Sequence, residues 1–168
     1  DHLDLRTVRN GIVGASTLPL EVANGVAEKF GFPLIEGWGM TETHGFATMN
    51  PLHGENRVGS VGIRLPYMQI KIAKLNENGH SVRECNTDEI GVILIKGPQV
   101  ITGYVDDAHN QDAWVENDWL NTGDLARKDA DGYIWHTGRA KDLIIRGGHN
   151  IDPVLIEEIL YQVPGVEL

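Results

Sequence analysis

Three short segments of the sequence carry residue types that could together bind a nucleotide. The first, residues 36–42 (EGWGMTE), places two glycines around an aromatic side chain. Trp38 offers a flat face to a purine, Thr41 a hydroxyl to a phosphate, and Glu42 a hard carboxylate oxygen to Mg²⁺. Glycines let backbone approach a ligand closely. A lone GxG pattern is weak evidence, so a glycine-rich turn beside an ordinary core tryptophan explains this stretch equally well.

The other two segments lie downstream. Residues 119–124 (WLNTGD) end on Asp124, whose carboxylate could accept both ribose hydroxyls, as an acidic residue does in dinucleotide folds. Residues 138–153 begin with Gly and Arg139, a candidate ribose or phosphate contact. They also contain Gly147 and Gly148, where a chain-like ligand could pass close to the backbone. Taken singly, these segments could also be a turn aspartate and a charged linker before a hairpin turn.

The overall composition argues against several classes of protein. The 168 residues are 41% apolar and 23% charged, as in globular domains. No apolar run approaches the roughly 20 residues of a membrane span, and residues 1–6 lack the basic and apolar regions of a signal peptide. The net charge of −10 argues against a nucleic-acid surface, whose affinity rests on Lys and Arg.

Cysteine and histidine usage is equally restrictive. The single cysteine, Cys85, excludes an internal disulfide and fits a reducing compartment, so we expect a cytoplasmic protein, or one held at a membrane only through parts outside this sequence. The seven histidines form no close HxxxH pair, which leaves a zinc site with little support.

The first third of the chain has the pattern of a strand, a helix and a second strand. An apolar strand is expected at residues 11–13. Ser16 and Thr17 are expected to cap a helix that has Pro19 in its first turn. Its apolar face comprises residues 22, 23, 26, 27 and 30, and Gly31 should end it. A buried strand follows from residues 32–35. Such a βαβ unit is typical of a parallel sheet.

The middle of the chain, from about residue 65 to 137, has the pattern of antiparallel sheet, either a small barrel or a curled sheet. Strands are expected at 69–73 and 89–96. The dipeptides Asn78-Gly79 and Asp131-Gly132 predict hairpin turns.

A third pattern begins near Arg139. Residues 143–145 predict a short strand, and Asp152 with Pro153 predicts the start of a helix. Its apolar stripe comprises residues 156, 159, 160 and 163. The stretch from residue 142 to 168 is too short to fold alone without disulfides, a metal ion or oligomerisation, so we expect a truncation at this end.

Together, in this order and spacing, the three segments resemble the acyl- and aryl-CoA synthetases, AMP-dependent ligases of the adenylate-forming superfamily. The resemblance covers nearly the whole chain. It implies a fold that is α/β plus β: the C-terminal part of that family's large N-terminal domain, with the beginning of its small α+β C-terminal domain. The implied divisions are residues 1–64 (parallel sheet with the adenylate segment), 65–138 (antiparallel, barrel-like) and 139–168 (hinge and start of the C-terminal domain).

The resemblance also implies roles for individual residues. Asp124 would bind the ribose hydroxyls with help from Arg139, Trp38 would stack on adenine, and Thr41 would contact the α-phosphate. Glu42 would be a Mg²⁺ ligand. The full set implied to contact ATP or AMP is Gly14, Ala15, Ser16, Glu36, Gly37, Trp38, Gly39, Met40, Thr41, Asp124 and Arg139.

The last segment implies a conformational role. Lys141 would be the hinge about which the C-terminal domain rotates, and Gly147, Gly148 and His149 would face coenzyme A. The implied ligands are ATP or AMP, Mg²⁺, coenzyme A and a carboxylic acid, a fatty acid being favoured. No nucleic-acid partner and no transmembrane segment are expected, and a homo-oligomer remains open.

The sequence also departs from the family pattern. The Gly/Ser/Thr-rich phosphate loop of the family is not found in this sequence, and its adenylation lysine would lie beyond Leu168. We therefore expect a fragment that is inactive alone and binds nucleotide weakly. Two alternatives stay open: a peptide-synthetase adenylation domain and a non-catalytic nucleotide-binding module. Residues 142–145 (DLII) after the hinge favour the CoA ligases.

Overall fold

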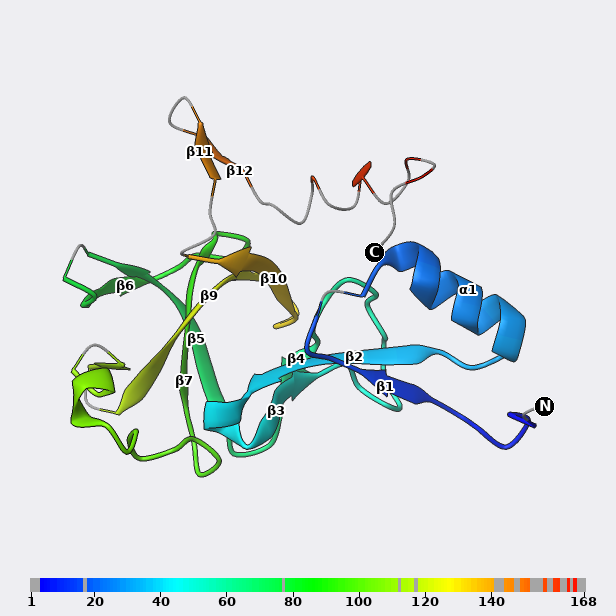
Figure 1. Ribbon diagram of the computed structural model, residues 1–168, viewed down its shortest axis with the longest axis horizontal. Helices are drawn as coiled ribbons and strands as arrows, with labels where there is room; N and C mark the ends of the chain where they lie inside the picture. The colour runs from blue at the N-terminus through cyan, green and yellow to red at the C-terminus, as the bar shows by residue number, and fades with distance from the viewer. Residues whose placement is uncertain are drawn as a thin grey trace.

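The computed structural model describes residues 4–16, 18–76, 78–111, 113–116 and 118–140, and beyond them residues 144–146, 149–151, 156, 159, 160, 163 and 165. Its strands form a four-stranded mixed sheet, a six-stranded antiparallel sheet and a two-stranded hairpin (Figure 1). The mixed sheet has the order β1-β2-β3-β4, with strands β1 (Gly11–Val13), β2 (Leu34–Met40), β3 (Gly45–Met49) and β4 (Ile63–Arg64).

The strand–helix–strand unit predicted at the start of the chain is confirmed. β1 pairs in parallel with β2, and helix α1 (Leu20–Phe30) connects them. Gly31 ends the helix in the left-handed conformation, with φ of 77°, as expected for a C-terminal glycine. The predicted cap by Ser16 and Thr17 is wrong: the N-cap is Pro19, whose side chain makes no capping hydrogen bond. The helix begins one residue after the proline, whose φ of −61° sets the chain direction.

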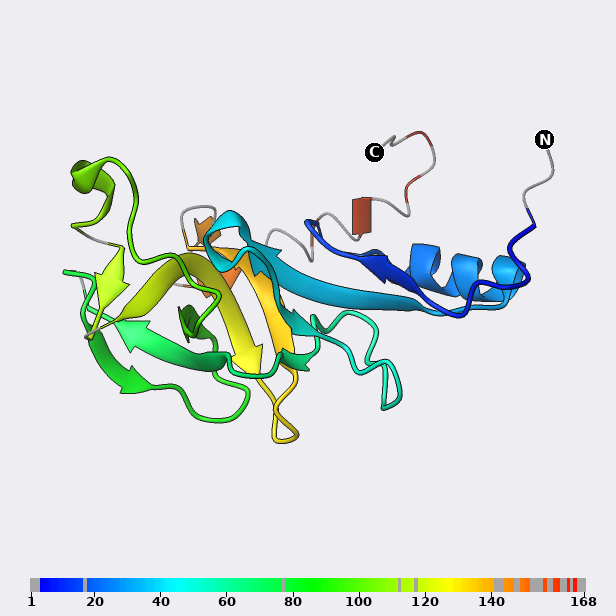
Figure 2. The same cartoon turned by 90° about the horizontal axis from the view of Figure 1, so that it is seen from below.

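The apolar face predicted for α1 is only partly buried. Ala23 is buried, whereas Val22 and Phe30 are each 43% exposed. The helix packs chiefly against β2 and lies at the end of the molecule that is remote from the antiparallel sheet (Figures 1 and 2). Sequence periodicity therefore found the helix correctly but overestimated how much of it the described residues cover.

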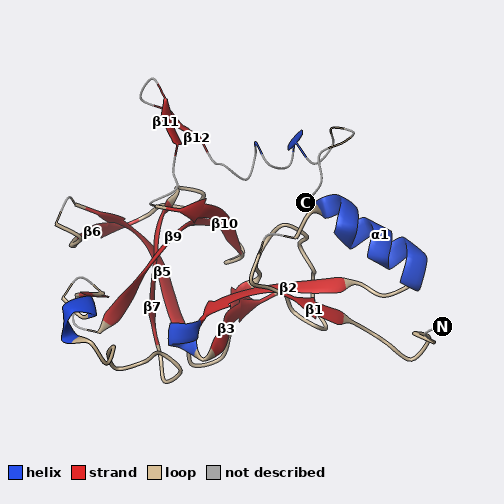
Figure 3. Ribbon diagram, in the orientation of Figure 1, coloured by secondary structure: helices blue, strands red, loops and turns tan. Residues whose placement is uncertain are grey.

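The six-stranded sheet confirms the antiparallel prediction for the middle of the chain. It is strongly curved (Figure 3) and has the order β10-β9-β7-β5-β6, with β8 paired to β9. The main core lies against it and includes the fully buried Met68, Ile72, Ile93, Ile95 and Leu120. The strands are β5 (Gln69–Leu75), β6 (Ser81–Glu84), β7 (Gly91–Lys96), β8 (Trp114–Val115), β9 (Trp119–Lys128) and β10 (Ile134–Arg139).

Both predicted hairpin turns occur where the dipeptides placed them. Gly79 has φ of 77° in the β5–β6 turn and Gly132 has φ of 87° in the β9–β10 turn. In the first turn, Asn76 Oδ1 also accepts hydrogen bonds of 3.0 Å from the backbone N–H groups of Asn78 and His80. Side-chain acceptors of this kind stabilise turns locally.

Residues 57–62 tie the mixed sheet to the antiparallel sheet. Ser60 Oγ donates to Ile134 O at 2.8 Å, Val61 N to the same oxygen at 3.0 Å, and Ile134 N donates back to Gly62 O at 2.8 Å. Ile134 begins β10, so these bonds fix the start of β10 against the strand connection that precedes β4.

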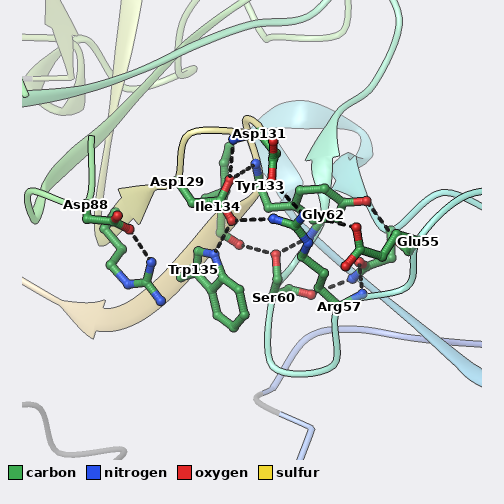
Figure 4. Close-up of polar contacts among 12 residues, drawn as sticks. Glu55, Arg57, Ser60, Gly62, Asp88, Asp129, Asp131, Tyr133, Ile134 and Trp135 are labelled. Carbon is green, nitrogen blue, oxygen red and sulfur yellow. Dashed lines mark hydrogen bonds and ion pairs between the residues drawn. The ribbon is translucent and has the colours of Figure 1, made fainter. Parts of the chain in front are cut away.

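An arginine reinforces this junction from outside (Figure 4). Arg57 Nη1 lies 2.8 Å from Asp129 Oδ2, and Nη2 lies 2.7 Å from Asp131 Oδ2 and 3.0 Å from Glu55 Oε2. The guanidinium also lies over the ring of Tyr133, 4.1 Å from its centroid, an arrangement that favours Arg over Lys. The β9–β10 hairpin is thereby held against residues 55–62.

Little of the final segment is described. β11 (Ile144–Arg146) and β12 (His149–Ile151) form an antiparallel hairpin, and β11 overlaps the strand predicted at 143–145. Most of the predicted helix at 152–163 lies outside the described residues, although Ile156, Ile159 and Leu160 are helical and exposed. In the part of the chain that the structure describes, no helix has the length and apolarity needed to cross a bilayer.

Candidate nucleotide site

A cavity of about 190 Å³ lies where the mixed sheet meets the antiparallel sheet. It brings together residues from the predicted first, second and third segments, together with Ala15 and Ser16. Gly59, Val61 and His136 also line it and were not predicted. The complete lining is Ala15, Ser16, Glu36, Gly37, Trp38, Gly39, Met40, Gly59, Val61, Asp124, His136 and Arg139.

Asp124 is directed into the cavity by an irregularity in β9. Between β7 and β9 the register shifts around Thr122 and Gly123, and Gly123 has φ of 71°. Asn121 Oδ1 accepts from Gly123 N at 3.0 Å, while Thr122 Oγ1 accepts from Asp124 N at 3.1 Å and donates to Ile93 O at 2.9 Å. Bulges re-aim side chains in this way, so each residue of the NTGD motif helps to place the carboxylate.

The two oxygens of Asp124 have different surroundings. The side chain is 6% exposed. Oδ2 accepts from Trp38 Nε1 at 2.9 Å and lies 3.7 Å from His136 Nε2. Oδ1 forms an ion pair with Arg139 Nε at 3.2 Å but accepts no hydrogen bond. Burial alone would raise the pKa of Asp124, but His136, Trp38 and the Arg139 charge together hold it below its ordinary value.

Glu36 presents a second carboxylate oxygen without a partner. The residue is 3% exposed. Oε1 accepts from Leu18 N at 3.3 Å, and Oε2 is buried and accepts nothing. Burial raises the pKa of Glu36, and the backbone N–H groups of Leu18 and Gly59 and the nearby His136 oppose that rise. Leaving such an acceptor unpaired costs about 1–3 kcal/mol, so this cavity is suited to a ligand that brings hydrogen-bond donors.

Replacing Glu36 with glutamine should raise the melting temperature at neutral pH by a few degrees. A carboxyl whose folded pKa is raised destabilises the fold wherever it is ionised, and that cost disappears as the pH falls through the raised pKa towards the ordinary value of 4.5. The gain of Glu36→Gln should therefore shrink on acidification. Melting curves of Glu36→Gln across this pH range would test this prediction. Glu28→Gln, a change on the exposed side of α1, is the control. A gain that is constant with pH would contradict the assignment.

The glycines of β2 are required by the chain's own packing. A Cβ on Gly37 would lie 2.8 Å from Thr48 O and 2.9 Å from the Phe46 ring, and one on Gly39 would lie 1.9 Å from Gly45 O. A Cβ on Gly14 would lie 2.5 Å from the same Phe46 ring. Strand β2 thus continues through these glycines, although the sequence suggested that they serve close approach to a ligand.

Thr41 and Glu42 do not line this cavity. They begin a single 3-10 turn (Thr41–Thr43) after β2, in which Thr43 is buried and Thr41 is exposed. Glu42 Oε1 accepts from the hydroxyl of Tyr104 at 2.8 Å. Burial and the Glu42 carboxylate raise the pKa of Tyr104. Tyr104 lines a neighbouring cavity, and Arg139 lines both, so Arg139 connects the Asp124 and Glu42 sides of the site.

A larger cavity, of about 700 Å³, lies between residues 49–53, residues 63–66 and the β9–β10 hairpin. Its lining is mainly apolar, and none of the unpaired buried polar atoms found among the described residues belongs to it. Two of those atoms, Glu36 Oε2 and Asp124 Oδ1, belong to residues that line the smaller cavity. Polar groups that fix a ligand's orientation distinguish binding sites, so the smaller cavity is the candidate site.

Several predicted site residues lie elsewhere or outside the described residues. Gly14 packs against Phe46 and is not part of the cavity lining. Lys141, Gly147 and Gly148 lie outside the described residues, and of His149 only its place in β12 is described. No group of three or more His, Cys, Asp or Glu side chains able to hold a metal occurs in the described ranges.

Known proteins match this chain closely in sequence and structure. Over 147 residues it is 50% identical to the marinolic acid–CoA ligase of Pseudoalteromonas sp. (strain SANK 73390), an alignment covering 88% of this chain and 22% of that protein. It is 34% identical to the long-chain-fatty-acid–CoA ligase of Bacillus subtilis (strain 168), covering 99% of this chain and 29% of that protein.

The fold agrees with a solved structure of the same group. O-succinylbenzoate coenzyme A synthetase from Bacillus subtilis, in complex with ATP and magnesium ion, superposes with a TM-score of 0.82 at 32% identity. The match covers 95% of this chain and 32% of that one, so the mixed and antiparallel sheets correspond to part of a larger structure. The chain spans about a fifth to a third of the length of these relatives. The family model of AMP-binding enzymes matches residues 1–105, and the chain belongs to that family.

Proposed function

We propose that the chain forms the adenylate-binding part of an AMP-forming acid–CoA ligase. The observation that carries the proposal is a pair of buried carboxylates that line one cavity and each keep one oxygen without a hydrogen bond, Asp124 Oδ1 and Glu36 Oε2. Ribose hydroxyls are donors suited to Asp124, and the exocyclic amine of adenine is a donor suited to Glu36. Trp38 lines the same cavity and donates to Asp124 Oδ2, and Arg139 adds a cation beside the ribose position.

The proposed reaction has two steps. The carboxylate of the acid attacks the α-phosphorus of ATP, which forms acyl-AMP and releases pyrophosphate. The thiol of coenzyme A then attacks the acyl carbon, and AMP leaves. The residues of this chain would bind and orient the adenylate in both steps, and such positioning is a major part of catalysis in phosphoryl chemistry.

The remaining predicted roles belong to the same proposal. Glu42 would supply one carboxylate ligand to Mg²⁺, which usually keeps phosphate oxygens and waters as its other ligands. Thr41 would contact the α-phosphate from the turn after β2. Lys141 would be the hinge, and residues 147–149 would meet coenzyme A. The divisions at 64/65 and 138/139 would separate the three parts of the enzyme represented here.

The acid is proposed from the relatives. Those named above act, by name, on marinolic acid, long-chain fatty acids and O-succinylbenzoate. We propose that the acid is a fatty acid, as in the name of the long-chain-fatty-acid–CoA ligase of Bacillus subtilis. The alternative of a peptide-synthetase adenylation domain has no support among these relatives, all three of which are named as CoA ligases or synthetases.

A nuclear magnetic resonance titration of the 168-residue chain with AMP would test the proposal. We expect weak binding, in the millimolar range, with backbone shifts concentrated at residues 36–40, 123–124 and 136–139. GMP is the matched control, because its 6-oxo group would place an acceptor against the Glu36 carboxylate, and it should bind more weakly. Equal shifts with both nucleotides, or shifts centred on the larger cavity, would overturn the proposal.

A further inference from the structure

His136 is an ionisable residue of the cavity that has no part in the proposed function. It lies on β10, its side chain is 23% exposed, and Nε2 is 3.7 Å from Asp124 Oδ2. That distance is too long for a hydrogen bond, but it is short enough for a polar N–H to stabilise a buried carboxylate electrostatically. Three charged groups face it across the cavity: Asp124 from β9, Glu36 from β2 and Arg139 from β10.

A bulge in β10 places His136 and Arg139 on the same face of the sheet. His136 pairs with Ala126 and Arg139 pairs with Asp124, and the register shifts between them. Ala126 and Asp124 are two residues apart on β9, so they share a face. On β10 the corresponding pair is three residues apart and would point to opposite faces in a regular strand. Thr137 is the extra residue of the bulge, and it brings His136 and Arg139 back to one face. Its Oγ1 is buried and has no hydrogen-bond partner.

The same bulge fixes which ring nitrogen carries the proton. The backbone N–H of Gly138 donates to His136 Nδ1 at 3.3 Å. A nitrogen that accepts from an N–H has no proton of its own, so the neutral ring carries its proton on Nε2. That proton faces Asp124 Oδ2, the oxygen that also accepts from Trp38.

We propose that His136 is a positioning residue for the ribose-binding carboxylate. Trp38 and His136 both direct N–H groups at Oδ2 of Asp124, which leaves Oδ1, beside Arg139, without a hydrogen bond and able to accept one from a ribose hydroxyl. The inference rests on the proposed function, because it assumes that Asp124 binds ribose. It adds that the bulge at Thr137 links this carboxylate to Arg139, so the orientation of Asp124 and the course of the chain towards the hinge depend on one local structure.

The state of the ring can be measured without any ligand. Imidazole nitrogen-15 shifts of the 168-residue chain, recorded at a pH where the ring is neutral, should show the proton of His136 on Nε2. In Asp124→Asn, the Nε2–H resonance should move, whereas the shifts of the other histidines should not. A ring with its proton on Nδ1, or an Nε2–H that does not respond to Asp124→Asn, would overturn the proposal whether or not the chain binds AMP.

A comparison of two variants with three ligands tests the positioning role. His136→Phe keeps a planar ring without nitrogens, and Thr137→Val is the control at the neighbouring bulge position. From the initial slopes of the shifts, His136→Phe should weaken AMP binding about three- to tenfold, less than for loss of a hydrogen bond to a charged group, because the 3.7 Å contact is longer than a hydrogen bond. Thr137→Val should change it less than twofold, a threshold set by the small effects of changes that leave the contacts intact.

The ligands 2′-deoxy-AMP and 3′-deoxy-AMP then separate a positioning role from a structural one. If His136 acts through Asp124, the loss of binding free energy caused by His136→Phe should not add to the loss caused by removing the ribose hydroxyl that Asp124 binds. Both changes remove the same contact. His136→Phe should therefore cost much less with at least one deoxynucleotide than with AMP. Equal losses with all three ligands would overturn the inference and leave the proposed function standing. If wild-type chain binds no nucleotide, the proposed function fails, and the ring measurements alone decide the contact between His136 and Asp124.

Discussion

Asp124→Asn is expected to weaken AMP binding by at least about tenfold, and by up to about a hundredfold if both ribose hydroxyls depend on the charge. Hydrogen bonds to a charged group contribute about 1.5–3 kcal/mol each, and 1.4 kcal/mol corresponds to a tenfold change in affinity. The substitution keeps the size of the side chain but removes the charge and one acceptor oxygen. Because AMP is expected to bind the unaltered chain only in the millimolar range, its binding to Asp124→Asn should be too weak to measure by titration.

The fold should tolerate this change less well at neutral pH than in acid. Because the folded pKa of Asp124 lies below its ordinary value, the ionised form stabilises the protein at neutral pH. That contribution is lost only as the pH falls below the ordinary aspartate value of 3.8. Asp88→Asn is the matched control, since Asp88 is an exposed carboxylate paired with Arg127 and remote from the cavity. Unchanged AMP binding in a folded Asp124→Asn chain would remove the ribose assignment.

Gly62→Ala should be the most destabilising single methyl addition at the junction between the sheets. Gly62 has φ of 82°, and a Cβ there would lie 2.0 Å from Met49 C and 2.1 Å from Asn50 N. Both neighbours are backbone atoms, so no side chain can rotate to relieve the clash. We expect a loss of about 4 kcal/mol or more in the free energy of unfolding, at the extreme of single substitutions, measured by urea denaturation.

Gly79→Ala separates the clash from the backbone strain. Gly79 has φ of 77°, close to that of Gly62, but nothing lies within 4 Å of the position its Cβ would take. The strain of a left-handed residue alone costs about 1–2 kcal/mol, and that is the loss expected for Gly79→Ala. If the two variants lose the same stability, the packing of residues 49–50 against Gly62 is not as close as described.

The sequence predicted elements best where local rules decide the structure. Helix α1, its end at Gly31 and the turns at Gly79 and Gly132 follow from periodicity and from glycine's access to positive φ. The exposure of Val22 and Phe30 could not be predicted in this way, because burial depends on what the rest of the fold places over the helix. The prediction that Ser16 and Thr17 cap the helix was also wrong, because Pro19 rather than a residue with a hydroxyl side chain precedes the first helical residue.

The candidate site likewise contains residues that the sequence predicted and residues, among them His136, that it did not. Asp124, Arg139 and Trp38 could be found because their segments resemble a known family, and the cavity confirms that they lie together. His136 gave no such signal. It lies two residues after Ile134, a core residue at the start of β10, and three residues before Arg139, a spacing that in an ordinary strand would place it on the wrong face. Only the register of β10 against β9, a contact between segments, reveals the bulge that turns His136 towards Asp124.

The bulge at Thr137 has a consequence for how this part of the chain can change over evolution. Side chains around the cavity can be exchanged one at a time, each with a local effect. Loss of Thr137 would replace the bulge with a regular strand, in which His136 and Arg139 would be two residues apart and would still share a face. Gain of one residue beside an intact bulge would instead move Arg139 to the opposite face. We therefore expect related sequences to vary in residue type between 136 and 139, and to lose the bulge residue more readily than they gain one there.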